Sequence, residues 1–222
     1  MADYTVNGAP VQVITVKLPR RGIWSARCKL TGNKALPPRA AVSIQLGDLT
    51  LRGVVRSGGV FVESSEYLIV GGYDGWARPV GKRPHRTDAG VKLSRVVADL
   101  AKDAGELLEV RQGADRMLGY AWPQVAGTAS EALDTVAPSW WMSPSGVTIV
   151  GERPVVELPK VAKWTLVSFD PAQRLAVVSP GNDMLAAFQP GLHLAAKGMD
   201  IVAGSVVMMV NDRKTTIEIW AL

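Results

Sequence analysis

The spacing of apolar and polar residues over the first 75 positions predicts a meander of short β-strands. Residues 41–46 (AVSIQL) alternate between apolar and polar, and the Gly47-Asp48 turn leads directly into LTLRGVV. Such alternation indicates strands with one buried face, and a short glycine-bearing turn between two such runs indicates a hairpin. Further strand-like runs, of which VQVITV is the clearest, end at similar turns. This order is typical of a small barrel or sandwich.

The apolar period changes to that of a helix between residues 88 and 106 (DAGVKLSRVVADLAKDAGE). Apolar residues lie on one stripe at helical spacing there: Leu93, Val96, Val97, Leu100, Ala101 and Ala104. Asp88 is expected to cap the N-terminus, and Gly105 is expected to follow the last helical turn. The preceding residues, 74–86, are rich in glycine and proline and are expected to form a loop.

A second short helix is predicted over residues 128–137, because Thr128 and Glu131 have the spacing of a capping box. The following segment, WWMSPSGVTIV, predicts a hairpin. Trp140 and Trp141 are adjacent in it, so their side chains are expected to face opposite sides of the strand. One of them is expected to face the core, and the other a second layer or a partner.

These patterns predict a mainly β chain with two short helices (α+β), built from small β-barrel or sandwich modules. After a proline-rich linker the chain returns to strand-like runs. We therefore expect three units along the chain. They are an N-terminal β module at residues 1–86, a helix-hairpin middle segment at 87–153 and a C-terminal small β-barrel at 154–222.

Composition and charge narrow the class of protein. The 222 residues are 47% hydrophobic and 20% charged, which provides for a folded core and argues against disorder. The net charge of +5 is modest, and the short basic cluster at residues 78–86 has no interleaved aromatic residues, so nucleic acid is not an expected partner. The single cysteine, Cys28, excludes an intramolecular disulfide. No apolar run is long enough to span a bilayer.

The sequence lacks the motifs that carry common chemistry. It contains no phosphate-binding or dinucleotide-binding glycine motif and no G-x-S-x-G nucleophile elbow. The two histidines, His85 and His193, have no partner at a metal-ligand spacing, and with one cysteine a zinc site is not expected. We therefore expect no catalytic residues, no metal site and no cofactor.

Three stretches carry a resemblance to a known family. The first, AVSIQLGDLTLRGVVRSGGVFVESSEYLIVGGYDGW with the later DAGVKLSRVVADLAKDAGE, resembles the first part of the tail hub proteins of tailed bacteriophages and of related contractile-injection baseplate hubs. The second, ASEALDTVAPSWWMSPSGVTIVGERP, is similar to the hub's unit of short helix, tryptophan and hairpin. The third, WTLVSFDPAQRLAVVS with FQPGLHL and the closing strands, resembles the terminal small β-barrel of such proteins.

The resemblance implies a structural virion component rather than an enzyme. Such a protein would be a hub-like subunit of a phage tail or baseplate that links the tail tube to the central spike or tip. It implies a homotrimer whose other partners are the tail tube protein, the spike or tip protein and further baseplate proteins. The implied location is the virion tail, after assembly in the bacterial cytoplasm. With 222 residues the chain would be a compact hub.

Partner contacts are expected from two regions. The loop at residues 74–86 offers Trp76, Arg78, Lys82 and Arg83. The C-terminal strands offer Val206, Met208, Val210 and Trp220. The run VAGSVVMMV has apolar residues on both faces, which is typical of a strand buried on two sides. The mean hydropathy of +0.12 also favours a chain with apolar surface that a partner covers.

Two alternative functions stay open at this point. An OB-like barrel binds single-stranded nucleic acid or a saccharide through aromatic and basic side chains, here Trp76, Arg78, Lys82 and Arg83. A cell-wall hydrolase of the tail tip would use Asp74, Asp88 and His85. The carboxylates are scattered, however, and the pattern favours solvated surface groups.

Overall fold

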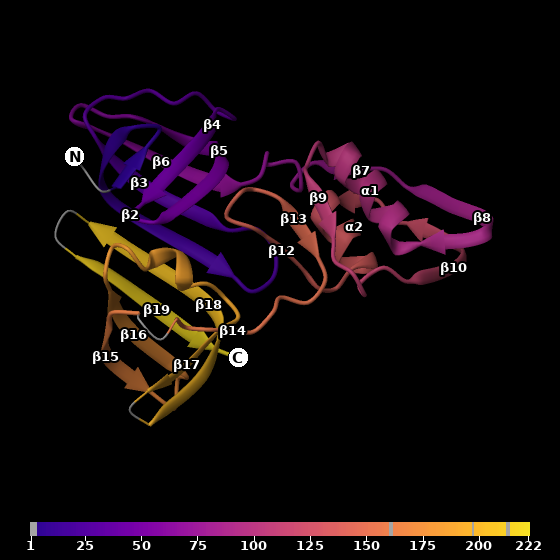
Figure 1. Ribbon diagram of the computed structural model, residues 1–222. Coiled ribbons are helices and arrows are strands. Elements are labelled where there is room, and N and C mark those ends of the chain that lie inside the picture. The colour runs from indigo at the N-terminus through magenta and orange to yellow at the C-terminus, as the bar shows by residue number, and fades with distance from the viewer. Residues whose placement is uncertain (1–3, 160–161, 197, 212–213) are drawn as a thin grey trace.

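The computed structural model describes residues 4–159, 162–196, 198–211 and 214–222. It is mostly β with two helices, as the sequence predicts. Figure 1 shows two β modules beside each other and a third unit that projects to one side. No helix in the described ranges has the length and apolar character needed to cross a membrane.

The first module is a closed antiparallel barrel. Its strands are β1 (Tyr4–Val6), β2 (Ala9–Pro19), β3 (Ser25–Thr31), β4 (Ala41–Leu46), β5 (Leu49–Val60) and β6 (Ser64–Gly71). They pair in the order β1-β4-β5-β6-β3-β2, and β1 also pairs with β2, which closes the sheet. The alternation read from the sequence places the apolar side chains inside. Fully buried examples are Val6, Ile14, Val16, Leu30, Ile44, Leu51 and Ile69.

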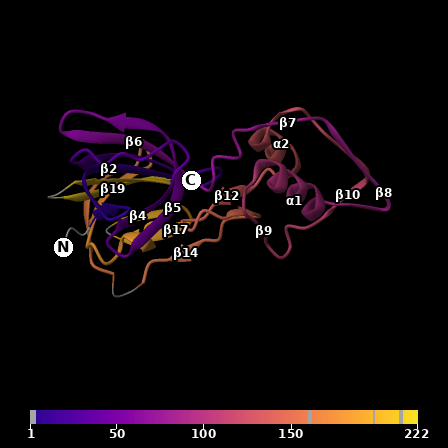
Figure 2. The same cartoon turned by 90° about the horizontal axis from the view of Figure 1, so that it is seen from above.

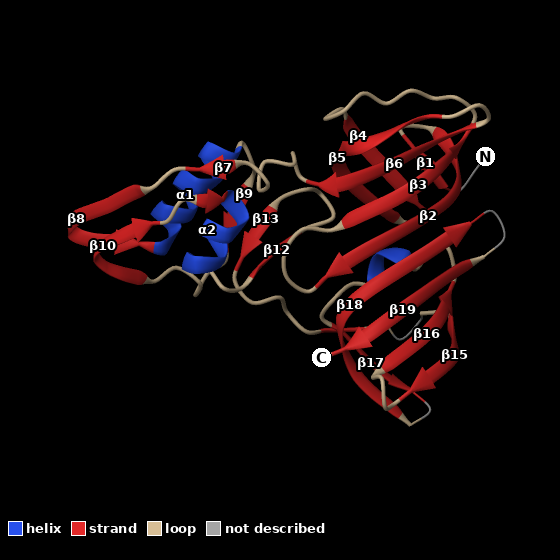
Figure 3. Ribbon diagram, turned by 180° about the vertical axis from the view of Figure 1, so that it is seen from behind, coloured by secondary structure: helices blue, strands red, loops and turns tan. Residues whose placement is uncertain are grey.

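The second module continues the same sheet. Its elements are β14 (Val156–Glu157), β15 (Trp164–Asp170), β16 (Leu175–Pro180), the 3₁₀ turn η1 (Leu185–Ala187), β17 (Leu192–Ala196), β18 (Met199–Asn211) and β19 (Thr215–Ala221). The long strand β18 pairs with β2 in register from Ser205 opposite Pro19 to Asn211 opposite Val13. One twelve-stranded sheet therefore runs through both modules, as Figure 3 shows from behind.

The third unit holds both helices. Its elements are β7 (Pro79–Val80), β8 (Arg83–Lys92), α1 (Leu93–Ala104), β9 (Leu108–Val110), β10 (Met117–Gln124), β11 (Gly127–Thr128), α2 (Ala129–Val136), β12 (Trp140–Met142) and β13 (Thr148–Val150). The helices pack against each other, and β12, β13 and β9 form a small sheet. The ribbon of β8 and β10 lies at the far end of the unit (Figure 2).

The helix ends were predicted in part. The capping box of α2 is confirmed: the Thr128 hydroxyl accepts from the Glu131 N–H, and the Glu131 carboxylate accepts from the Thr128 N–H. Gly105 ends α1 with a left-handed φ of 75°, as predicted. The prediction that Asp88 caps α1 is wrong, because α1 begins five residues later and Lys92 precedes it without a side-chain cap. Asp88 instead lies within β8.

The expected loop at residues 74–86 is also partly wrong. It contains β7 and the start of β8, which pairs with β10. The ladder has register shifts on both sides of Gly119, so the ribbon is irregular. β8 continues across residue 86, where the sequence pattern placed the end of the first unit.

Side-chain hydrogen bonds of Trp24 and Glu106 are among the contacts that fix the third unit to the barrel. The indole Nε1 of Trp24 donates to the Ser143 carbonyl at 3.1 Å. The buried carboxylate of Glu106 accepts from the N–H groups of Gly75, at 2.6 Å, and Tyr73, at 3.0 Å. The first contact joins the barrel to the β12–β13 hairpin, and the second joins the turn after β6 to the end of α1. Together they fix the position of the third unit relative to the barrel.

Candidate interaction site

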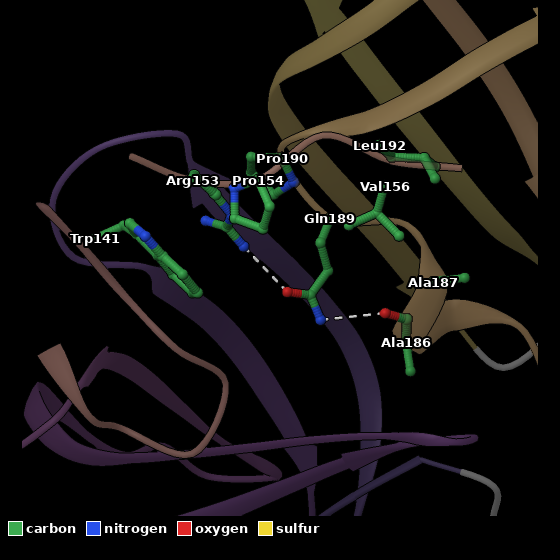
Figure 4. A pocket seen from close by; sticks show the side chains of 9 residues that line it. All are labelled: Trp141, Arg153, Pro154, Val156, Ala186, Ala187, Gln189, Pro190 and Leu192. Carbon is green, nitrogen blue, oxygen red and sulfur yellow. Dashed lines mark hydrogen bonds between the residues drawn. The ribbon is translucent and has the colours of Figure 1, made fainter. Parts of the chain in front are cut away.

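A pocket of about 240 Å³ lies where the three units meet. Figure 4 shows its lining: Trp141 from β12, Arg153 and Pro154 from the segment after β13, Val156 from β14, and Ala186, Ala187, Gln189, Pro190 and Leu192 from the second β module. Most of this wall is apolar. The polar groups are concentrated at one side, around Arg153.

Arg153 connects all three units. Its guanidinium lies over the indole of Trp141, with Cζ 4.2 Å from the ring centroid. It donates to the Pro19 carbonyl at the end of β2 (3.3 Å) and to Oε1 of Gln189 (3.0 Å). Gln189 in turn donates to the Ala186 carbonyl, as the dashed lines in Figure 4 show. Arg153 is only 7% exposed, so these contacts replace nearly all of its hydration.

The positive charge around this pocket is not balanced. Burial, together with the nearby cations Arg20 and Arg111, lowers the pKa of Arg153 to about 10. The Arg111 guanidinium lies 5.6 Å from the Trp141 ring. In the described ranges no carboxylate forms an ion pair with any of these three arginines.

Two buried donors beside the pocket have no acceptor among the described residues. They are Nη1 of Arg20 and Nε1 of Trp141. Buried polar groups are usually hydrogen-bonded, and buried charges are usually paired. Unpaired donors and excess positive charge together suit an anionic acceptor such as a carboxylate, which guanidinium groups bind with two parallel hydrogen bonds.

The two adjacent tryptophans face opposite sides, as the sequence predicts. Trp140 packs toward Trp76, with ring centroids 5.8 Å apart, and its Nε1 donates to Asp134 at 2.6 Å. The Trp141 ring instead contacts the guanidinium groups of Arg111 and Arg153. Both tryptophans are at least nine-tenths buried.

The residues expected to contact partners divide into two groups. Trp76, Val206, Met208 and Val210 are in the hydrophobic core, and the Trp76 Nε1 donates to Thr148 at 2.8 Å. Their assignment as interface residues is corrected, because Trp76 packs against Trp140 inside the third unit and the other three are the alternate residues of β18 that face the inside of the second module. Arg78, Lys82, Arg83 and Trp220 lie on the surface. Contact between these four residues and a partner stays a prediction.

The three residues considered for hydrolysis lie apart, and two of them have other partners. Asp74 lies 3.8 Å from Arg56, and the buried His85 lies 3.6 Å from Asp99 and 3.4 Å from Gln124. Asp88 is exposed on the ribbon. No hydrogen bond or ion pair in the described part of the chain joins these three residues. Among all the residues that the structure describes, no group of acids, cysteines and histidines is placed to hold a metal ion.

A surface histidine holds the segment that leads from the pocket into β14. Nδ1 of His193 lies 2.7 Å from Glu157, and Nε2 lies 2.6 Å from Asp200. Hydrogen bonds to Asp200 and Glu157 raise the pKa of His193 above 6.5. Its stabilising effect is therefore complete below pH 6.5 and is lost as the pH rises through the raised pKa.

We expect the melting temperature of the protein to fall as the pH rises above 6.5, and we expect the variant His193→Gln to lack this part of the fall. Thermal unfolding followed by intrinsic fluorescence over a pH series measures both. His85→Gln is the matched control. Identical pH profiles for the wild type and His193→Gln would contradict the prediction.

Solved structures provide the comparison that decides the fold. The chain matches the tail protein of Neisseria meningitidis MC58 with a TM-score of 0.65 and 14% identity, over 97% of this chain and 94% of the other. It matches the 43 kDa tail protein of prophage MuSo2 from Shewanella oneidensis with a TM-score of 0.66 and 11% identity, over 99% and 96%. This chain has a phage tail-protein fold.

A third match extends the tail-protein fold beyond phages. The E. coli c3393 protein, a component of the type VI secretion system with structural similarity to T4 bacteriophage tail proteins gp27 and gp5, gives a TM-score of 0.63 at 12% identity. That match covers 97% of this chain and 75% of the other. No protein-family model matches the sequence, and no curated protein sequence matches it significantly. The resemblance read from the sequence is thus confirmed at the level of the fold.

Proposed function

We propose that the chain is a structural, non-enzymatic, hub-like subunit of a phage tail or baseplate. In this role it links the tail tube to the central spike or tip, and it contacts the tail tube protein, the spike or tip protein and other baseplate proteins. It works in the virion tail after assembly in the bacterial cytoplasm. The observation that carries the proposal is the pairing of β2 with β18, which fuses two β modules into one sheet, in a fold shared with tail proteins.

The same architecture supports a homotrimeric ring. Each chain contributes two β modules, so three chains would place six modules around one axis.

For the boundaries between the units of one chain, we propose a boundary near the Gly72–Gly75 turn instead of residue 86, since β8 belongs with α1 and β10. The second boundary stays near residue 153, where Arg153 ties the units together.

Light scattering coupled to size-exclusion chromatography tests the ring. We expect a mass three times the 23.7 kDa of one chain, with the trimer population rising as concentration rises. Electron microscopy of tail particles labelled on this chain tests its location. A monomer at every accessible concentration that never enters a tail particle would remove the proposal.

A further inference from the structure

The hairpin between β5 and β6 ends in an apolar tip with an unpaired acid. Phe61 is 57% exposed and Val62 is 90% exposed. The turn is tight, since the Phe61 N–H donates to the Ser64 carbonyl at 2.7 Å. Glu63, which follows Val62, is exposed and forms no ion pair with a described residue. Large apolar side chains exposed together on a loop tip indicate a surface that a partner covers.

The junction pocket has the complementary character. Its walls are apolar, through Pro154, Val156 and Leu192 among others. Its polar side is formed by Arg153 and Gln189, and the nearby cations Arg20 and Arg111 add positive charge around Arg153. A carboxylate that follows two exposed apolar side chains therefore matches the pocket in charge and in polarity.

A chain cannot place this tip in its own pocket. The tip precedes Ser64 at the start of β6, whereas Gly71 at the other end of β6 packs against Trp24 and Met142, next to Trp141 of the pocket. At about 3.3 Å per residue, the two ends of this extended strand are about 23 Å apart. A contact between tip and pocket must therefore join two copies, head to tail.

We propose that the β5–β6 tip of a second copy of this chain docks in the junction pocket. The Glu63 carboxylate accepts hydrogen bonds from the Arg153 side of the pocket, and Phe61 and Val62 cover the apolar wall. The proposal rests on the proposed function, because it supplies the subunit contact of that ring. A head-to-tail contact of this kind closes into a ring when its rotation permits.

Cysteine cross-linking tests the contact directly. The native Cys28 is buried, and burial raises the pKa of its thiol to about 11, so it contributes little background. One preparation carries Val62→Cys, which keeps the Glu63 carboxylate, and the other carries Val156→Cys, at the pocket wall. The two are mixed under subunit exchange and treated with a short bis-maleimide. We expect a cross-linked dimer from the mixture and little from either preparation alone.

The matched control is Val155→Cys. Val155 and Val156 are equally exposed, at 56% and 55%, but Val155 does not line the pocket. We expect several-fold less dimer from Val155→Cys. Equal yields, or no dimer from either mixture in a sample that light scattering shows to be oligomeric, would overturn the docking contact while leaving the ring intact. A monomeric protein that gives no dimer would overturn both.

Charge reversal gives an independent readout. Glu63→Arg is expected to raise the dissociation constant of the oligomer about tenfold or more, since it places a fourth cation against the arginines. Asp88→Arg reverses an exposed acid on the β8–β10 ribbon, away from both the tip and the pocket, and is expected to leave the dissociation constant unchanged. Sedimentation velocity measures both. An unchanged constant for Glu63→Arg would contradict the proposal.

Discussion

Replacing Trp24 by alanine is expected to lower the free energy of unfolding by about 3–5 kcal/mol. The side chain is 1% exposed and fills space that Gly53 and Gly71 leave open. A Cβ at Gly71 would lie 2.6 Å from the Trp24 Nε1, so no larger residue at that glycine could share the space. The substitution removes this packing and leaves the buried Ser143 carbonyl without its donor at 3.1 Å.

Urea denaturation followed by circular dichroism measures the loss. Trp220→Ala is the matched control: Trp220 is 39% exposed, so its removal is expected to cost about 1 kcal/mol or less. Because Trp24 joins the barrel to the β12–β13 hairpin, we also expect the Trp24→Ala variant to unfold in a broader transition, with the helical unit released first. Equal losses from the two variants would show that Trp24 has no special structural role.

The sequence predicted those features of the fold that local signals encode. The Thr128–Glu131 capping box, the left-handed glycine at 105 and the hairpin at 140–150 each depend on residues a few positions apart. The β8–β10 ribbon was missed for the opposite reason. Most of β10 is exposed and it contains Gly119 and Pro123, so it shows no apolar alternation. A strand without a buried face has no period to read.

The candidate site could not be predicted from spacing. Arg20, Arg111 and Arg153 are far apart in the sequence, and only the meeting of three units brings Arg20 and Arg111 near Arg153, which lies over Trp141. The prediction that residues of β18 contact a partner was wrong, because both faces of the strand are apolar and the sequence does not indicate which face is buried. Val206, Met208 and Val210 fill the second module, while the alternate residues Val207 and Met209 are half-buried.

Replacing Glu106 by alanine is expected to lower the free energy of unfolding by about 3 kcal/mol. The change leaves the N–H groups of Tyr73 and Gly75 without their acceptor at a turn packed closely against the helix end. A Cβ at Gly75 would lie 2.0 Å from the Ala104 carbonyl oxygen, so the turn has little room to move and find a new acceptor. Glu109→Ala, at an exposed carboxylate of β9, is the control and is expected to change stability by about 0.5 kcal/mol or less.

Glu106→Gln separates the hydrogen bonds from the charge. Its amide oxygen still accepts from both N–H groups, so we expect it to keep most of the stability that alanine loses. Burial raises the pKa of Glu106 above 4.5, despite the hydrogen bonds from Gly75 and Tyr73 that lower it. The wild type therefore loses stability as the pH rises from 4.5 through the raised pKa, and Glu106→Gln does not share this loss. Denaturation at a series of pH values tests this sign. If the free energy of unfolding of the glutamine variant fell relative to that of the wild type as the pH rises, the turn would stabilise the charged carboxylate more than burial destabilises it.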